Sequence, residues 1–503
     1  MKLIPTGTRQ WENKHETFKE KIKELYIAAN EPNLDALEGY NDCTRGFQNK
    51  LREAIQTNTP FRSLGGAWSF TKVATAKNGI MLDTKQLNLS FNLSEESVVP
   101  SYTGDIKKLL FAQCGNSVWE LHKELVPKKL SLKTCGASNG QTIVGAMATG
   151  AHGSAFDFGA VQDFIVGMHL IVSPDRHIWL ESKSSPVVSA SFIEKLETEL
   201  VQDDDLFNAA LVSFGSFGII HGVMIETEDI FLLETYMRKM PYDEVLKNLM
   251  TTLDFSNATL PCGNERPYHF SVIINPYDLP GGAYVSSFYK RPYREDYPKP
   301  VPNEAGIGPG DDAPCFIGKI TKIVPALVPV IVTKLLAGAL TPFEKQFGTM
   351  GEIFNNNTLH GKLASAAIGI SLDQVTRVTE ILFELNETEG PFPGLFAYRF
   401  VKKSKASFGF THFDFTCVLE LDAAPSKITS NFYTAVWNRL DQEQIPFTFH
   451  WGKMNELNFD RITRGYGTDT DVWIAARNKL LDADGMKVFT NSLLSEWGLD
   501  KVV

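Results

Sequence analysis

The residues best suited to chemistry form two loops of small side chains, about eighty positions apart. The glycines of the first loop let the backbone turn sharply and bring its N–H groups against a ligand, which suits a pyrophosphate. Its residues are Ser63, Leu64, Gly65, Gly66, Ala67, Trp68 and Ser69. The second loop, 136–154, consists mainly of Gly, Ala, Ser and Thr and could lie flat along a long cofactor. Either loop alone is also what a tight turn between strands looks like, and neither is a Walker or a Gly-x-Gly-x-x-Gly motif.

A second group of polar residues lies on two runs with strand periodicity. Within 411–422, apolar residues alternate with His412, Asp414, Thr416, Glu420 and Asp422, which predicts a half-buried strand with a row of donors and acceptors on one face. In the run 394–401, Ala397, Arg399 and Val401 share one face. From the residues alone, this face is either an active face or a solvated outer surface.

The elements that must position these groups are mixed helices and strands. Apolar spacing predicts helices over 16–30, 46–57 and 117–125, strands over 79–83, 97–102 and 108–114, and a hairpin over 164–180. Beyond residue 230, 269–275 is strand-like and 277–314 is a Pro/Gly-rich connection. This order predicts an α+β fold.

One long apolar run, 323–340, resembles a membrane span in length. Pro325, Pro329 and Lys334 argue against spanning. We expect either a core helix of the second domain or an apolar wall or lid over a substrate, and peripheral contact with a membrane stays open.

Composition narrows the class of protein. The 503 residues favour two domains, and the net charge of -10 disfavours a nucleic-acid surface. The six cysteines are scattered without a C-x-x-C pair, which predicts reduced, buried thiols and neither a metal site nor a disulfide framework. The amino terminus has no apolar run typical of a signal peptide, so we expect a cytoplasmic protein.

Four motifs in order along the chain give these loops a family context. They are Arg-x-Leu-Gly-x-x-x-Ser-Phe at 62–70, Ala-Thr-Gly-x-His-Gly-Ser at 148–154, Gly-x-x-Gly-Ile-Ile at 215–220 and His-Trp-Gly-Lys at 450–453. Together they resemble the PCMH-type FAD-binding domain of the vanillyl-alcohol oxidase superfamily. The pattern is most similar to the branch of alditol oxidases, aldonolactone oxidases and class II cholesterol oxidases.

The resemblance implies an FAD-binding domain over 1–228, a substrate domain with an antiparallel sheet over the flavin at 229–440, and a return to the FAD domain at 441–503. Besides the first loop, the cofactor-binding residues it implies are Gly136, Thr142, Gly145, Ala146, Met147, Ala148, Thr149, His152, Gly153, Ser154, Gly218, Ile219, Ile220 and Lys453. Trp68 stands where the family's flavin-linking histidine is expected, so the resemblance implies that FAD is held without a covalent bond at this site.

The resemblance also assigns roles on the polar face. Arg399 and Lys453 are the expected electrostatic residues. The polar face itself, and not the resemblance, offers Asp414 or His412 as the candidate proton acceptor. The expected substrate contacts are Ala137, Ser138, Ala397, Arg399 and Thr416. Ala397 replaces a glutamate that holds polyols, which places an alditol substrate in doubt. Gly136 falls at the position that controls access of oxygen to the flavin, where a glycine would admit it.

These features predict an FAD-dependent oxidase of a hydrophobic, sterol-like alcohol, with oxygen as electron acceptor and hydrogen peroxide as product. The alternatives are a dehydrogenase, a polyol or lactone oxidase of the same family, and a flavin-binding protein without catalysis, which Trp68 and Ala397 motivate.

Overall fold

The first part of the chain, residues 1–229, contains two sheets. The structure is a computed structural model that describes residues 1–301, 324–356 and 362–502. The four-stranded sheet has the spatial order β1 (Lys2–Pro5), β4 (Glu24–Ala29), β6 (Ile80–Gln86) and β5 (Phe61–Leu64). The six-stranded sheet has the order β12 (Glu199–Gln202), β11 (Arg176–Glu181), β10 (Ile165–Ser173), β13 (Ile219–Glu226), β8 (Leu109–Gln113) and β7 (Ser90–Asn92).

Five helices and two small strand pairs complete this part. The helices are α1 (Ala36–Gln56), α2 (Val118–Leu125), α3 (Ile143–Ala148), α4 (Ala190–Lys195) and α5 (Asp204–Leu211). The strand pairs are β2 (Gln10–Glu12) with β3 (Lys19–Lys21), and β9 (Leu130–Ser131) with β14 (Glu228–Asp229).

The second part is built on one eight-stranded sheet. Its spatial order is β18 (Phe343–Gly348), β15 (Phe231–Met240), β17 (Ala283–Pro292), β16 (His269–Ile274), β20 (Gly394–Lys402), β21 (Phe415–Ala423), β19 (Ala364–Ser371) and β22 (Phe447–Phe449). All of the paired strands run antiparallel. The α+β fold with a large antiparallel sheet is as the sequence predicts.

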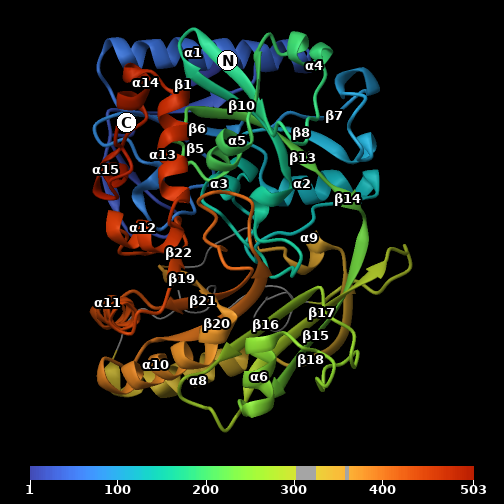
Figure 1. Ribbon diagram of the computed structural model, residues 1–503, viewed down its shortest axis with the longest axis vertical. Coiled ribbons are helices and arrows are strands. Elements are labelled where there is room, and N and C mark those ends of the chain that lie inside the picture. Colours follow the sequence, from blue (N-terminus) through green and yellow to red (C-terminus); the bar gives the residue numbers. More distant parts are fainter. Residues whose placement is uncertain (302–323, 357–361, 503) are drawn as a thin grey trace.

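Helices cover one face of this sheet, and the first part lies against the other (Figure 1). The covering helices are α6 (Glu244–Thr252), α10 (Val375–Thr388) and α11 (Lys427–Gln442), which pack on alternate residues such as Phe396, Tyr398 and Phe400. Because side chains alternate along a strand, Ala397 and Arg399 point to the opposite face. This second face, the open face of the sheet, is directed toward the loops of the first part.

The last helices return to the first part of the molecule (Figure 1). They are α12 (Phe459–Tyr466), α13 (Asp469–Leu480), α14 (Ala483–Val488) and α15 (Ser492–Glu496). Trp473 and Trp497 pack against Phe214 within the core of the first part. The predicted domain limits at 228 and 440 stay predictions.

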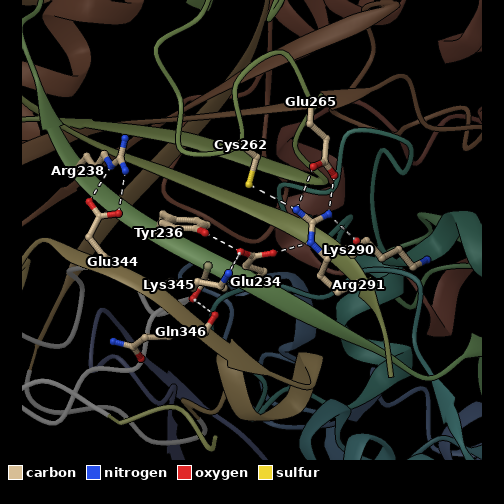
Figure 2. Close-up of polar contacts among 11 residues, drawn as sticks. Glu234, Tyr236, Arg238, Cys262, Glu265, Lys290, Arg291, Glu344, Lys345 and Gln346 are labelled. Carbon is tan, nitrogen blue, oxygen red and sulfur yellow. Dashed lines mark hydrogen bonds and ion pairs between the residues drawn. The ribbon is translucent and has the colours of Figure 1, made fainter. Parts of the chain in front are cut away.

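A charged network ties the edge of the large sheet together (Figure 2). Glu234 of β15 accepts a hydrogen bond from Tyr236 (2.6 Å) and forms ion pairs with Arg291 of β17 and Lys345 of β18. Arg291 also forms a bidentate pair with Glu265 (2.6 and 3.0 Å). Opposite charges on neighbouring strands stabilise their pairing, so this network fastens β18 at the edge.

Most of the predicted elements are confirmed, and the errors have physical causes. The expected helix at 46–57 is the second half of α1, and helix 117–125 and hairpin 164–180 form as predicted. The expected helix at 16–30 is wrong, because 24–29 forms β4 between β1 and β6, a pairing with distant residues that local spacing does not reveal.

Three other predictions also need correction. Residues 97–102 form no named strand, and only Val98 makes an isolated bridge, to Val188. The expected connection at 277–314 contains the ten-residue strand β17, and its residues 302–314 lie outside the described part. The strand predicted over 411–422 begins only at Phe415.

Within the apolar run 323–340, of which residue 323 lies outside the described part, helix α8 (Val328–Ala339) follows a short 3₁₀ helix at Pro325–Leu327. Of the helices that the structure describes, none combines the length and hydropathy needed to cross a bilayer. Val328, Val332 and Leu336 face inward and contact a cluster on the open face of the large sheet that includes Ala397. This helix is therefore part of the core of the second part.

Candidate active site

A cavity of about 230 Å³ lies where the loops of the first part meet the open face of the large sheet. Both glycine-rich loops line it, as do Arg399, Glu420 and Lys453 from the second part and the chain that follows it. The structure thus brings together groups that are far apart in the sequence, such as Ser63 and Lys453, which are 390 positions apart.

The two loops approach each other at backbone distance. A Cβ added to Gly65 would overlap the Thr142 side chain, and one added to Gly66 would lie 2.6 Å from the carbonyl oxygen of Gly140. Glycine is therefore required at both positions, since any side chain would push the loops apart. Thr142 also caps α3 by accepting a hydrogen bond from the Gly145 N–H at 3.2 Å, which fixes the second loop.

Lys453 follows β22 in a turn that is fastened on both sides. The indole of Trp451 donates to the Phe408 carbonyl (2.7 Å), and the Gly452 N–H donates to His450 Nδ1 (3.0 Å). The Gly452 carbonyl accepts from the Phe70 N–H (2.7 Å). This last bond joins the turn directly to the first loop.

Glu420 of β21 is the centre of a buried charged cluster. Its carboxylate contacts the Lys453 ammonium and lies 2.7 Å from Arg399 Nε in an ion pair whose N–H is poorly aligned for a hydrogen bond. His152 Nε2 lies 3.7 Å from the same carboxylate. Two cations and one carboxylate leave a net charge of +1, with the histidine neutral.

Burial and the neighbouring charges set the protonation states of this cluster. Burial alone would raise the pKa of Glu420, but Arg399 and Lys453 outweigh it and hold that pKa well below its usual range. Burial lowers the pKa of His152, with Glu420 opposing in part, and places the pKa of His450 well below its ordinary value. At neutral pH the site therefore holds an ionised carboxylate beside neutral histidines.

The tautomer of His152 follows from its contacts. Nδ1 lies 3.0 Å from the carbonyl oxygen of Gly153, which can only accept, so Nδ1 carries the proton. The lone pair of Nε2 then points toward Glu420 and the cavity. This nitrogen is placed to accept a proton from a bound molecule.

Most of the residues predicted from the sequence line the cavity. All seven residues of the first loop do so, together with Gly136, Ala137, Ser138, Thr142, Gly145, Ala146, Ala148, Thr149, His152, Gly218, Ile220, Arg399 and Lys453. Other predicted residues lie near it without lining it, namely Met147, Gly153, Ser154, Ile219 and Ala397.

Three predicted residues of the polar strand lie elsewhere. Asp414 is exposed, and His412 packs edge-on against Tyr466 with ring centroids 5.3 Å apart. The Thr416 hydroxyl accepts a hydrogen bond from the Phe413 N–H and donates one to the Phe413 carbonyl, and these two bonds close the turn before β21. None of the three lines the cavity, so the geometry offers no support for their predicted roles.

Two residues that line the cavity, Glu420 and His15, were not among the site residues predicted from the sequence. Glu420 shares the polar face of the predicted strand, and the signal for its role was the register that places it opposite Ala397. His15 lies in the loop between β2 and β3, and nothing in its sequence context indicated that this loop folds back onto the site.

The first part of the chain is similar in sequence to a known protein family. Residues 45–179 match the family model of the FAD binding domain. The chain is 24% identical to L-gulonolactone oxidase 3 of Arabidopsis thaliana over 77% of this chain and 68% of that one. It is 23% identical to L-gulono-1,4-lactone dehydrogenase of Mycobacterium tuberculosis over 50% of this chain, and the match spans only 48% of that relative's length.

The fold as a whole is similar to that of a solved cholesterol oxidase. A variant of the enzyme from Brevibacterium sterolicum superposes with a TM-score of 0.68 at 14% identity, covering 99% of this chain and 97% of that one. The similarity extends over both parts and confirms the predicted fold.

Proposed function

We propose that this chain, which belongs through its residues 45–179 to the FAD-binding domain family, is an FAD-dependent oxidoreductase that oxidises an alcohol to a carbonyl compound. The observation that carries the proposal is the meeting of the glycine loops with the Arg399–Glu420–Lys453 cluster around one cavity. The loops suit a long cofactor, and the cluster suits a reacting hydroxyl.

The residues of the cavity fit FAD. The glycines at 65 and 66 form a wall without side chains, and the hydroxyls of Ser63 and Ser69 add donors along it. The Thr149 hydroxyl donates to the Gly145 carbonyl (3.0 Å) and so adds an acceptor. The indole nitrogen of Trp68 is buried without a hydrogen-bond partner, as expected of a donor awaiting a ligand. These residues would hold the cofactor, and Trp68 favours attachment without a covalent bond.

When bound, FAD supplies the acceptor for the hydride that leaves the substrate carbon. His152 Nε2 takes the hydroxyl proton, and Glu420 stabilises the imidazolium that results. Arg399 and Lys453 give the site its positive charge, which favours negative charge on the substrate oxygen as the proton leaves. Because the cluster is buried, these interactions are stronger than they would be in water.

An apolar substrate is favoured by the wall beside this cluster. Phe70 and Leu363 line the cavity and pack in the same cluster as Val332 and Leu336 of α8. Aliphatic and aromatic side chains exclude water and bind hydrocarbon surface. We therefore place a hydrophobic alcohol, such as a sterol, ahead of a polyol or a lactone.

Oxygen is the proposed electron acceptor, because Gly136 leaves space at the cavity wall. A Cβ added there would meet its nearest heavy atom, the His152 carbonyl oxygen, only at 3.4 Å. One relative bears the name of a dehydrogenase, so a protein that uses another acceptor is the second candidate.

The test begins with the visible spectrum of the purified protein. We expect an oxidised-flavin band, bleaching by an apolar secondary alcohol without oxygen, and hydrogen peroxide when oxygen returns. Bleaching without peroxide formation would assign a dehydrogenase. A flavin band that no alcohol, lactone or polyol bleaches would assign a flavin-binding protein without catalysis, and a protein that stays colourless with added FAD would remove the proposal.

A further inference from the structure

The N-terminal hairpin forms part of the wall of the cavity. The loop between β2 and β3 is fastened to the first cofactor loop by three hydrogen bonds. The Lys14 N–H donates to the Ala67 carbonyl (3.0 Å), Asn13 Nδ2 to the Ser69 carbonyl (2.9 Å), and the Thr17 hydroxyl to the Phe70 carbonyl (3.1 Å). The hairpin therefore holds one fixed position against the loop.

His15 projects from this hairpin into the cavity wall. Its ring stacks on Phe70 with centroids 3.7 Å apart and an interplanar angle of 19°, and it meets Trp68 edge-on at 5.9 Å. Only 3% of the residue is exposed, and the ring makes no hydrogen bond that satisfies both distance and angle, although the backbone of Trp68 lies close enough to interact with it. A buried polar atom without a partner destabilises a protein, so such atoms commonly face a ligand.

The ring of His15 is neutral over the physiological range. Burial lowers its pKa to about 3, with the backbone of Trp68 opposing and Lys14 and Lys453 adding to the decrease. A neutral imidazole has one N–H donor and one acceptor nitrogen. It suits a heterocycle whose edge carries both carbonyl oxygens and N–H groups.

The position of His15 in the cavity indicates which part of the cofactor it would contact. Phe70, on which it stacks, is joined to Gly452, and Thr71 donates to the Trp451 carbonyl at 3.0 Å. His15 therefore lies at the same end of the cavity as Lys453. That end holds the groups proposed to act on the substrate.

We propose that His15 is a cofactor-binding residue that hydrogen-bonds the flavin ring of FAD, and that the N-terminal hairpin is a component of the cofactor site. The inference rests on the proposed function, since it requires that FAD binds. On this inference, His15 helps to keep FAD bound, a role that a covalent bond at position 68 would otherwise have.

Two histidine variants form a matched test. His15→Phe keeps the stacking on Phe70 and removes both ring nitrogens. His122→Phe is the control, because His122 is also buried (5% exposed), has a ring nitrogen without a partner, and has a pKa that burial lowers to about 4, but it does not line the cavity. The readouts are the dissociation constant of FAD from fluorescence quenching and the flavin-to-protein absorbance ratio after gel filtration.

We expect His15→Phe to bind FAD about tenfold more weakly, as for the loss of one buried hydrogen bond, and His122→Phe to bind it as the wild type does. His15→Gln, which restores a donor and an acceptor, should recover part of the affinity. Equal affinity in His15→Phe and wild type would overturn the inference alone, whereas a wild-type protein that binds no FAD would overturn the proposed function. If His15→Phe does not fold, His15→Leu, which also removes both ring nitrogens, replaces it: weaker binding in the Leu variant than in the Gln variant supports the contact, and equal binding in the two variants overturns the inference.

Discussion

Glu420 lies directly opposite Ala397 across the β20–β21 pair, and its carboxylate contacts Arg399 and Lys453. Opposite residues on one face of an antiparallel pair have Cβ atoms about 5 Å apart. A carboxylate on β21 therefore reaches the space that the resemblance assigned to a carboxylate at position 397. The site keeps an acid, supplied from the neighbouring strand.

Glu420→Gln should lower the rate of anaerobic flavin bleaching by about 10²-fold, because the amide neither balances the two cations nor stabilises a protonated His152. FAD affinity should stay near that of the wild type. Stopped-flow absorbance measures this rate with the alcohol that bleaches the wild-type flavin fastest.

Asp414→Asn is the matched control for this variant, since Asp414 is exposed and does not line the cavity. We expect it to bleach at the wild-type rate. The reverse result, a slow Asp414→Asn and an unaffected Glu420→Gln, would restore the assignment made from the sequence.

What the sequence could predict depends on how local the signal is. The cofactor loops are contiguous, and the Ser117 cap of α2 is completed by Glu120 three residues later, so both are visible in the sequence. The role of Glu420 depends on strand register, and that of His15 on a hairpin folding back over the site. Such relationships join distant residues, and local periodicity does not encode them. The helix wrongly expected at 16–30 failed for the same reason, since β4 is specified by its pairing with β1 and β6.

Acidification should destabilise the first part through its buried histidines, among them His169 and His221. Tyr40 contacts His169 Nδ1 (2.7 Å), and Thr44 contacts His221 Nδ1 (3.0 Å). The pKa values of His169 and His221 lie well below 6.5, mainly because both rings are buried and to a smaller extent because of neighbouring histidines. The unfolded chain binds protons at these sites near pH 6.5 and the folded chain does not, so the stabilisation is present above pH 6.5 and is lost as the pH falls. We expect the free energy of unfolding to decrease by about 1.4 kcal/mol per pH unit for each histidine below that pH.

Urea unfolding at pH 7.0, 6.0 and 5.0 measures this slope. The double variant His169→Gln/His221→Gln should be less stable at pH 7.0 and should show a shallower slope between pH 6.5 and 5. An unchanged slope in that variant would exclude these histidines as the cause.

Gly136→Ala should slow the reaction of the reduced protein with oxygen by about tenfold or more and leave anaerobic bleaching unchanged. The added methyl fits without displacing backbone, because its nearest neighbour would lie 3.4 Å away, and it would occupy space at the cavity wall. Peroxide production and anaerobic stopped-flow traces separate the two half-reactions. A variant that keeps full oxygen reactivity would show that oxygen enters elsewhere.

Leu336→Ala should weaken both the fold and the binding of apolar alcohols. Leu336 is buried in the cluster that includes Leu363 and Phe70, and truncation of a buried leucine costs about 2–5 kcal/mol of unfolding free energy. We expect a higher KM for apolar substrates and little change for small polar ones. Val330→Ala on the same helix is the control, since Val330 is 52% exposed and its truncation should change stability by at most about 0.5 kcal/mol.

The wild-type protein should release its flavin when it is precipitated with acid. The residue between Ala67 and Ser69 is Trp68, and the lone pair of an indole nitrogen belongs to its aromatic system, so it does not form the bond that a histidine nitrogen forms. Yellow colour in the supernatant, in wild type and in Trp68→Phe alike, is the expected result. Colour that stays in the pellet would contradict it, and mass spectrometry of the flavin-bearing peptide would then identify the attached side chain, with the peptide containing His15 examined first because that ring borders both Trp68 and the cavity.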